Sequence, residues 1–403
     1  MTTRRNLLII AGGAALTAAC REQAHAAVSV PDVVVAEGSR GLVVLGGERP
    51  RDLGREAVLS PDGAVACTVT RDDAGAPVLL RLDPAKGGPD GRVPLAPGWV
   101  PRVISADGAS CALTRTPASA RPAGRERTAL LVTTGVRQRR YDLGGVVEPD
   151  AFSSDGTGLF VLEWLPRQAP DRYRVRLLDL GSGELRPLFT RDKAPVPPGA
   201  EEEMRGDGRQ AVLSPGRDVL YTLYTHQPGH RHTRDLIAGR PGGVHAFVHV
   251  LHLAQGWAYC LDLPHPFGEG PAAGHALAAS ADGLSLAVAD VTSGSLAYAA
   301  TTSLKIERVV TAAAGGDAAS LAFTPDSGRV LIGAGTAVTA YDRAGTVAAR
   351  WSVPAGVRGL ALNGAGTRVY AGGAGEIVWL DAASGALRGR APVEGLTALR
   401  HVR

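Results

Sequence analysis

Short turns of the form Ser-x-Asp-Gly recur along this chain, and each separates two short apolar segments. Intact copies occupy residues 60–63, 105–108, 153–156 and 280–283, and altered copies occupy residues 214–218, 324–328 and 363–367. A single repeat cannot bury its own hydrophobic faces, so this recurrence predicts a repeat architecture in which neighbouring units stack on one another.

Each repeat is predicted to contain four β-strands, named A to D, with the Ser-x-Asp-Gly turn between A and B. The pattern is clearest in the seventh copy, where strands are expected at residues 357–362, 368–371, 376–381 and 386–390. Apolar and polar residues alternate in these segments and β-branched residues are common, which favours strands over helices. No stretch shows helical periodicity. The 52 glycines and 27 prolines suit many short strands joined by tight turns.

The two ends of the chain are predicted to form one further repeat together. Residues 396–402 match strand A, whereas residues 33–36, 41–45 and 49–53 match strands B, C and D without an A. Pairing these segments closes a ring and removes exposed sheet edges. Seven turns and the composite repeat predict eight blades, and seven blades are the alternative if one unit is miscounted.

The chain resembles the WD40-like and YVTN-type β-propellers of bacterial envelopes over about residues 32–403. The resemblance rests on the Ser-Pro-Asp-Gly turn at 60–63 and on the Asp-Ala-Ala-Ser-Gly turn at 381–385, between strands C and D. The Trp-Asp dipeptide of true WD40 blades does not occur in the sequence. The resemblance implies an all-β propeller of four-stranded antiparallel blades. It says little about activity, because propellers host many unrelated functions.

Residues 1–26 are predicted to be an export signal, and residues 27–403 a single propeller domain. A pair of arginines precedes an apolar stretch that is shorter than the about 20 residues of a spanning helix. The arginines followed by Leu-Leu resemble a twin-arginine (Tat) signal, whose passengers cross the membrane folded. Cys20 follows residues 17–19 as in a bacterial lipobox, and cleavage after Ala26 is the alternative. We expect an exported protein, either extracellular or lipid-anchored on the outer side of the cytoplasmic membrane.

The other three cysteines, Cys67, Cys111 and Cys260, are predicted to be buried free thiols. An odd number of cysteines does not make a complete disulfide framework. Cys67 and Cys111 fall in equivalent strands of consecutive repeats, and packed sheets lie about 10 Å apart. A disulfide needs Cα atoms within about 7 Å of each other, so this pair is not expected to form one.

Five segments are longer than the repeat requires: 116–127, 165–172, 191–209, 226–243 and 263–274. Each connects strand B to C or strand D to the next A, and in a propeller blade these connections lie on one face of the disc. Binding residues concentrate on loops held by a rigid scaffold, so this face is predicted to bind a ligand; neutral drift in loop length would scatter over both faces. The candidate ligand-contacting residues are Arg121, Arg125, Arg127, Trp164, Arg167, Arg172, His226, His230 and His232.

The fourth repeat and its borders hold eight of the ten histidines. His226, His230 and His232 share one loop, where neutral imidazoles could converge on Zn²⁺ or Cu²⁺; a solvated loop is the alternative. In the strand that follows, alternation places His249 and His252 on opposite sheet faces. These strand histidines therefore cannot belong to one simple metal site.

The sequence favours a binding function over catalysis. It contains no serine-nucleophile elbow, zinc-protease helix, phosphate loop or haem-attachment motif. No spacing ties the acidic candidates Glu163 and Glu269 to the histidines. The three glutamates at 201–203 are interpreted as a solvated charge cluster, with a cation site as the alternative.

The 43 basic and 39 acidic residues are intermixed, and no basic run with interleaved aromatics predicts nucleic-acid binding. We expect a monomeric binding module for a protein, glycan or small molecule, with no cofactor firmly implied. The alternative is a metal-assisted hydrolase or lactonase that uses the histidine-rich fourth repeat.

Overall fold

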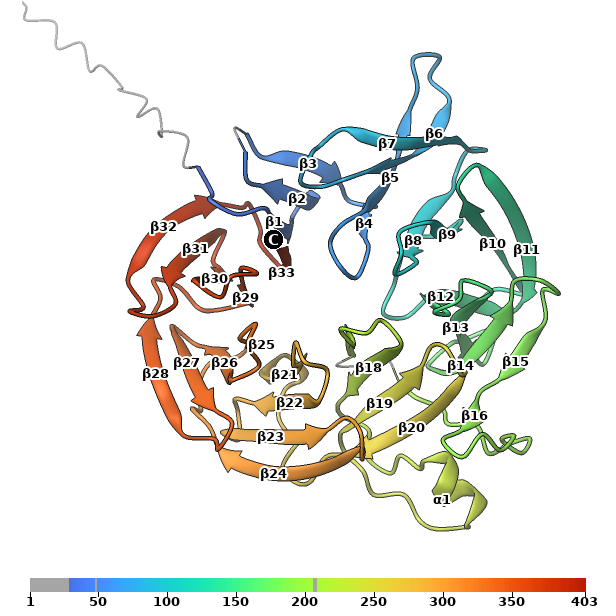
Figure 1. Ribbon diagram of the computed structural model, residues 1–403. Coiled ribbons are helices and arrows are strands. Elements are labelled where there is room, and N and C mark those ends of the chain that lie inside the picture. The colour runs from blue at the N-terminus through green and yellow to red at the C-terminus, as the bar shows by residue number, and fades with distance from the viewer. Residues whose placement is uncertain (1–28, 48, 206–208) are drawn as a thin grey trace, which may run out of the picture.

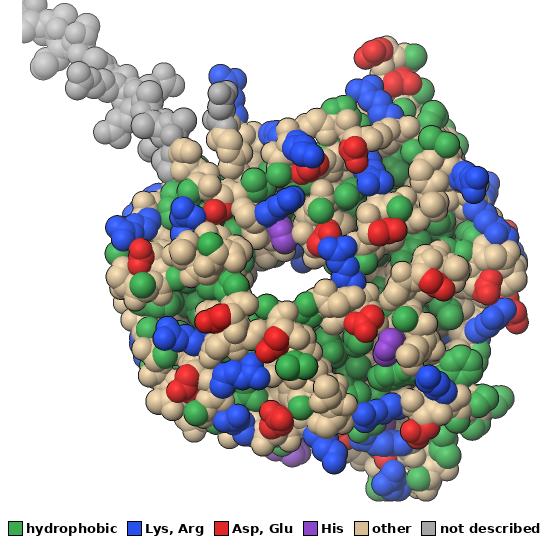
Figure 2. All heavy atoms as spheres, in the orientation of Figure 1, with side chains coloured by type: hydrophobic (Ala, Val, Ile, Leu, Met, Phe, Trp, Pro, Cys, Tyr) green, Lys and Arg blue, Asp and Glu red, His purple; other side chains and the backbone are tan. Residues whose placement is uncertain are grey.

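Strand pairing closes the chain into a ring of eight antiparallel blades around a central channel (Figures 1 and 2), which confirms the predicted eight-bladed β-propeller. The computed structural model describes residues 29–47, 49–205 and 209–403. The predicted export signal, with Cys20, lies outside the described residues. Basic and acidic side chains are interspersed over the face seen in Figure 2.

The first four blades follow one another from residue 58 onward. Blade one contains β4 (Val58–Leu59), β5 (Ala66–Arg71), β6 (Pro77–Leu82) and β7 (Pro89–Pro94). Blade two contains β8 (Val100–Ile104), β9 (Ser110–Thr114), β10 (Arg127–Thr134) and β11 (Arg137–Gly144). Blade three contains β12 (Val146–Phe152), β13 (Gly158–Leu165), β14 (Arg172–Asp179) and β15 (Leu185–Pro187). Blade four contains β17 (Gln210–Leu213), β18 (Val219–Tyr224), β19 (Phe247–His252) and β20 (Trp257–Asp262).

The remaining four blades complete the ring. Blade five contains β21 (His275–Ala279), β22 (Ser285–Asp290), β23 (Ser295–Ala300) and β24 (Lys305–Thr311). Blade six contains β25 (Ala319–Phe323), β26 (Arg329–Ala334), β27 (Ala337–Asp342) and β28 (Val347–Ser352). Blade seven contains β29 (Gly359–Leu362), β30 (Arg368–Gly373), β31 (Glu376–Asp381) and β32 (Leu387–Pro392). Blade eight contains β33 (Ala398–Val402), β1 (Val34–Gly38), β2 (Gly41–Leu45) and β3 (Arg51–Gly54).

The Ser-x-Asp-Gly turns join strands A and B of a blade through a repeated set of hydrogen bonds. In the first turn Ser60 Oγ donates to Asp62 Oδ1 (2.7 Å) and accepts from the Val65 N–H (2.9 Å). Gly63 has a φ of 68°, a left-handed conformation that glycine adopts without steric cost. The same serine–aspartate hydrogen bond forms in the turns that begin at residues 105, 153 and 280. The turn motif therefore fixes the reversal between A and B.

Blade eight joins the first and last strands of the described chain. β1 pairs antiparallel with both β2 and β33. The backbones of Val33 and Arg403 exchange two hydrogen bonds of 3.0 and 2.9 Å. Asp32 links this blade to blade seven, because its carboxylate accepts hydrogen bonds from Tyr370 Oη (2.6 Å) and Arg368 (3.0 Å). The predicted composite blade is confirmed, and both edges of β1 are paired.

Apolar side chains fill the spaces between neighbouring blades. Between blades three and four, Phe160 and Tyr173 pack against Tyr224 and Phe247, and all four are buried. Tyr224 stacks on Phe247 with ring centroids 5.3 Å apart, and Tyr173 Oη donates to Tyr224 Oη over 2.8 Å. This close-packed interface gives the connections above it a rigid support.

The three cysteines of the described chain are buried free thiols, as predicted. Cys67 in β5 and Cys111 in β9 belong to one hydrophobic cluster between blades one and two. Cys260 lies in β20 and belongs to the cluster between blades three and four.

Short additional elements interrupt the plain repeat around blade four. β16 (Phe189–Thr190) follows blade three and pairs parallel with β20, so it adds a fifth strand to blade four. The helix α1 (Thr233–Ile237) lies between β18 and β19, and the 3₁₀ helix η1 (Ala272–Gly274) precedes β21. Both β16 and α1 lie at the outer edge of the ring (Figure 1). A five-residue helix is too short to show the periodicity that sequence analysis relies on. In the part of the chain that the structure describes, no helix has the length and apolar character needed to span a membrane.

Candidate functional site

The five long connections leave the same face of the ring, as the repeat pattern predicts. Segments 116–127, 165–172 and 226–243 join strands B and C of blades two, three and four. Segments 191–209 and 263–274 lead into strand A of blades four and five. Because the strands of each blade are antiparallel, these connections lie opposite the Ser-x-Asp-Gly turns.

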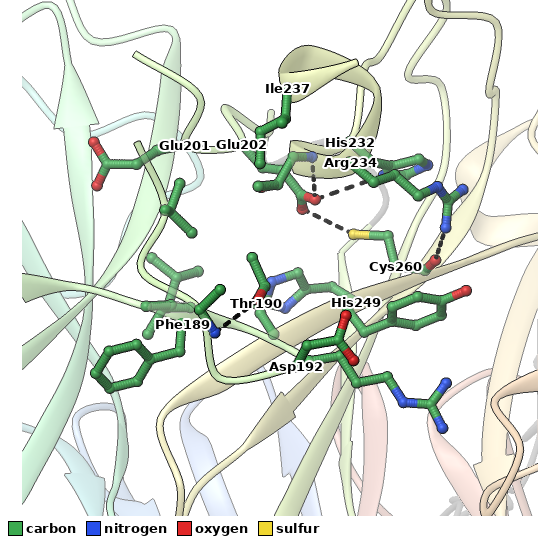
Figure 3. Close-up of a pocket in the computed structure, with 18 of the residues that line it drawn as sticks. Phe189, Thr190, Asp192, Glu201, Glu202, His232, Arg234, Ile237, His249 and Cys260 are labelled. Atoms are coloured by element: carbon green, nitrogen blue, oxygen red, sulfur yellow. Dashed lines mark hydrogen bonds and ion pairs between the residues drawn. The ribbon is translucent and has the colours of Figure 1, made fainter. Parts of the chain in front are cut away.

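A pocket of about 780 Å³ lies where two of these connections cover the outer strands of blades three and four. Val175 and Met204 contribute to its apolar wall. Phe189 of β16 and Ile237 of α1 line it as well, and these two side chains stay 44% and 55% exposed. Glu202, His232 and Cys260 lie together in one part of the pocket, whereas Glu201 and Asp192 lie apart from them (Figure 3).

Glu202, His232 and Cys260 bring a carboxylate, an imidazole and a thiol together in that part of the pocket (Figure 3). One ligand atom from each lies within 4.8 Å of the other two. Cys260 Sγ donates to Glu202 Oε2 over 2.9 Å, and His232 Nδ1 lies 3.9 Å from Glu202 Oε1. The side chains of His232 and Glu202 are only 2% and 12% exposed. Across residues 29–47, 49–205 and 209–403, no other three His, Cys, Asp or Glu side chains converge in this way.

Strand register and two connections assemble this cluster. Cys260 of β20 lies directly opposite His249 of β19, so both side chains point to the same face of blade four. Glu202 comes from the connection that follows β16, and His232 directly precedes α1. The Thr233 N–H donates to Glu202 Oε1 over 2.8 Å. The two connections are thus bonded to each other above the strand pair.

Asp262 contacts the other side of the His232 ring. His232 Nε2 lies 2.5 Å from Asp262 Oδ1. Arg234 forms an ion pair with Asp262 and donates to the Cys260 carbonyl oxygen over 3.3 Å. His232 Nδ1, on the Glu202 side of the ring, is buried and has no hydrogen-bond partner. One ring nitrogen therefore lies at ion-pair distance from a carboxylate, without a hydrogen bond to it, and the other lies on the Glu202 side.

Burial and nearby charge act against each other in the cluster. Burial favours a protonated Glu202, but His249, His232 and the hydrogen bonds from Cys260 and Thr233 outweigh it and hold the pKa of Glu202 below its usual value. Burial raises the pKa of the Cys260 thiol well above its usual range, and the Glu202 carboxylate adds to this shift. Burial also lowers the pKa of His249, against the attraction of Glu202. An ionised Glu202 carboxylate thus lies beside the neutral Cys260 thiol, and the His249 imidazole in the same pocket is neutral.

The three histidines of the predicted metal-binding trio do not share one cluster. His226 is exposed. His230 stacks on Phe247 with ring centroids 4.5 Å apart, and burial lowers its pKa to about 4. The ring centroids of His230 and His232 are 4.9 Å apart. Of the trio, His232 alone joins the carboxylate–thiol cluster.

The other predicted ligand-contacting residues lie along blades two and three. Three arginines form ion pairs: Arg125 with Glu148 (3.3 Å), Arg127 with Asp142 (2.8 Å) and Arg172 with Glu203 (2.5 Å). Trp164 is buried against Tyr173, with ring centroids 4.7 Å apart, and lines a separate pocket of about 290 Å³. Arg121 and Arg167 belong to segments 116–127 and 165–172. Of the predicted ligand-contacting residues, only His232 lines the 780 Å³ pocket.

Sequence analysis did not place Glu202, His249 and Cys260 in one site. The interpretation of residues 201–203 as a solvated charge cluster is wrong for Glu202, whose carboxylate is covered by the α1 connection and hydrogen-bonded by Thr233. Alternation correctly assigned the sheet face of His249, but only the pairing of β19 with β20 sets Cys260 opposite it. No local pattern relates Glu202 to Cys260, because Glu202 lies in the connection before β17 and Cys260 follows it by 58 residues, in β20.

Solved structures with a similar fold come from proteins of different kinds. A structure of apo AztD from Citrobacter koseri has a TM-score of 0.54 and 12% identity, and the match covers 91% of this chain and 96% of that chain. A crystal structure of the eukaryotic initiation factor has a TM-score of 0.50 and 13% identity, and the match covers 92% of this chain and 99% of that chain. The crystal structure of Saccharomyces cerevisiae Sqt1 has a TM-score of 0.47 and 12% identity, and the match covers 84% of this chain and 85% of that chain.

At 12% and 13% identity, the matches to AztD and to the initiation factor show the fold alone. No family model matches the chain, and no curated protein matches it. The chain is therefore an eight-bladed β-propeller, and a fold of this kind hosts many unrelated functions.

Proposed function

We propose that this protein is an exported binding module that holds a small molecule in the 780 Å³ pocket between blades three and four. The observation that carries this proposal is the make-up of the pocket, which joins apolar walls to a few converging polar groups. Small-molecule sites in proteins are commonly concave, about 300–1,000 Å³ in volume and mainly apolar. The pocket matches that description in size and in chemistry.

The residues of the pocket favour a ligand with an apolar body. Phe189 and Ile237 expose apolar surface to water from two different elements, β16 and α1. Tyr259 lies beside both Arg191 and Arg234, whose guanidinium carbons are 5.4 and 5.6 Å from the ring centroid. Covering such surface with a ligand removes apolar area from water, which stabilises the complex. We therefore propose a small apolar or amphipathic compound, and not a nucleic acid, as the ligand.

A second depression of about 780 Å³ lies on the opposite face, between blades six and seven. It is lined by turn residues, and their polar groups already form local hydrogen bonds. Asp326 accepts hydrogen bonds from Thr324 and Gly328, and Asp381 accepts hydrogen bonds from Ser384. Because these carboxylates stabilise their own turns, the depression offers a ligand fewer unused polar groups than the pocket on the loop face.

Export is proposed from the residues at the start of the sequence. The arginine pair and the short apolar stretch within residues 1–26 support Tat export, and Cys20 supports lipid anchoring outside the cytoplasmic membrane. N-terminal sequencing and mass analysis of the exported protein would distinguish lipidation at Cys20 from cleavage after Ala26. Retention of an intact leader inside the cell would contradict export.

The alternative function, a metal-assisted hydrolase or lactonase, receives less support. It depended on His226, His230 and His232, and these three side chains do not bring their ring nitrogens to one point. Binding is therefore the function that the geometry of the loop face supports best.

The binding proposal is tested by screening the purified protein against small amphipathic metabolites with native mass spectrometry. For a compound that binds, we expect Ile237→Ala to weaken the affinity about tenfold, since the lost apolar contact is worth roughly 1.5 kcal/mol. Leu284→Ala is the matched control, because Leu284 is also 55% exposed but lies beside a turn on the opposite face. The absence of any bound compound, or equal losses in both variants, would contradict the proposal.

A further inference from the structure

We propose that Glu202, His232, His249 and Cys260 form a zinc-binding site inside the pocket between blades three and four. The inference concerns a metal ion held by the protein itself, so it goes beyond the proposed binding of an organic ligand. It also holds independently of export.

The first support is the convergence of three different donor groups. The ligand atoms of Glu202, His232 and Cys260 lie within 4.8 Å of one another. Zinc bonds to sulfur, nitrogen and oxygen are about 2.0–2.3 Å long, so a tetrahedral ion holds its ligand atoms roughly 3.3–3.8 Å apart. Small side-chain rotations would bring the three atoms to that spacing around a central ion.

The second support is the unpartnered nitrogen of His232. The His232 side chain is 2% exposed, and neither ring nitrogen has a hydrogen-bond partner, although Nδ1 lies on the Glu202 side. Burying a polar atom without a partner is costly, and a metal ion between His232 and Glu202 would remove that cost. The other ring nitrogen lies 2.5 Å from Asp262. A carboxylate behind the distal nitrogen is the usual arrangement of a metal-bound histidine.

The proposed fourth ligand is His249, which is not one of the three converging donors and would turn toward the ion from the strand beside Cys260. It is the cross-strand partner of Cys260, and such partners have Cβ atoms about 4.5–5.5 Å apart on one sheet face. The side chain is 3% exposed and lines the same pocket. His249 also acts electrostatically on the Glu202 carboxylate. The His249 imidazole therefore lies on the same sheet face as Cys260 and close to the Glu202 carboxylate.

The charge and type of the donors favour zinc over calcium or magnesium. Thiolate and imidazole are ligands of zinc and copper, whereas the harder cations take oxygen ligands. Ionised Glu202 and Cys260 would carry two negative charges, which a divalent ion neutralises in a buried position. On binding, the Cys260 thiol releases its proton to solvent, and the sulfur lone pair forms the bond to the metal. Each zinc ion bound should therefore release about one proton at neutral pH.

The full purified protein is first stripped with a chelator and then titrated with Zn²⁺ against a chromophoric competitor. We expect one zinc ion per chain. We expect Cys260→Ser or His232→Ala to weaken binding at least about a hundredfold, and Asp262→Asn to weaken it about tenfold, as for carboxylates that orient a metal-bound histidine. The matched controls are Cys67→Ser, which alters another buried thiol, and His226→Ala, which alters an exposed histidine of the same loop. Neither control should change the affinity.

A second measurement on the unmutated protein keeps the test independent of variant folding. Co²⁺ bound at this site should show a thiolate-to-metal charge-transfer band in the near ultraviolet. The proposal is overturned if the stripped protein binds no zinc at micromolar concentration, or if bound Co²⁺ gives no thiolate band. It is also overturned if His226→Ala abolishes binding while Cys260→Ser, shown to be folded by circular dichroism, leaves it intact.

Discussion

His230 and His232 are buried neighbours, yet they differ in the groups around them. The His232 ring lies beside the carboxylates of Glu202 and Asp262. The His230 ring stacks on Phe247, and its Nε2 has no hydrogen-bond partner. Burial, with a smaller effect from His232, therefore lowers the pKa of His230 to about 4. A single side chain thus couples folding to pH close to the proposed metal site.

This coupling predicts a loss of stability in weak acid. The unfolded state takes up a proton on His230 near pH 6.5 and the folded state only near pH 4, so stability falls as the pH drops through that window. Between pH 7 and pH 5, protonation of His230 should lower the free energy of unfolding by about 2 kcal/mol. The variant His230→Phe keeps the aromatic stack but cannot take up this proton. In urea unfolding, its free energy of unfolding should therefore fall by about 2 kcal/mol less between pH 7 and pH 5 than that of the unmutated protein. The exposed His265→Gln variant is the control, and equal pH slopes in His230→Phe and the unmutated protein would contradict the prediction.

At the level of the turns and strands, one motif has different surroundings at different places in the ring. Gly63 and Gly156 end equivalent turns with φ values of 68° and 69°. A Cβ atom on Gly63 would lie 2.2 Å from the ring of His401 in β33, whereas one on Gly156 would meet nothing within 4 Å. The first turn is therefore packed against the strand that closes the ring, and the third turn is free of such a contact.

The two glycines provide a matched pair of substitutions. Gly156→Ala should lower the free energy of unfolding by about 1 kcal/mol, because alanine is strained in the left-handed conformation. Gly63→Ala carries the same strain and must also displace His401, so we expect it to lose at least about 1 kcal/mol more. Chemical denaturation of both variants measures the difference. Equal losses of unfolding free energy in the two variants would show that the contact with His401 does not add to the cost of Gly63→Ala.

These elements also show what the sequence could predict. Each turn is a local motif, so the order of strands and the face of each connection follow from the sequence alone. The strand β16 and the helix α1 are too short to leave a periodic signal. The partners Glu202 and Cys260 meet only because a connection from one blade folds over the next. Sequence analysis could therefore locate the loop face but not the cluster within it.

At the scale of the whole molecule, the ring depends on the pairing of β33 with β1. Blade eight packs on blade seven through β33 and on blade one through a hydrophobic cluster in which Leu59 of β4 contacts the side chains of β1 and β2. Asp32 adds a side-chain connection from this blade to Tyr370 and Arg368 of blade seven. Loss of β33 would leave β1 with an unpaired edge and weaken the contacts on each side of it.

Removal of residues 398–403 should lower the midpoint of thermal unfolding by at least about 10 °C. We also expect dimers or larger aggregates in light scattering, because an open strand edge pairs with other chains. Arg400→Ala is the control, since it removes only an exposed ion pair with Glu37 and leaves the backbone pairing intact. A truncated protein that stayed monomeric and melted like the Arg400→Ala variant would contradict this account of closure.

The backbone pairing of Val33 with Arg403 places two positions from opposite ends of the described chain side by side. The same ring of blades could therefore be built by a chain that starts and ends elsewhere in the ring. A few linking residues could join these neighbouring positions, and the chain could be opened instead at the turn of residues 280–283. Such a circular permutant would contain every blade interface described above. In it, blade eight would be continuous, and blade five would become the blade assembled from both ends of the polypeptide.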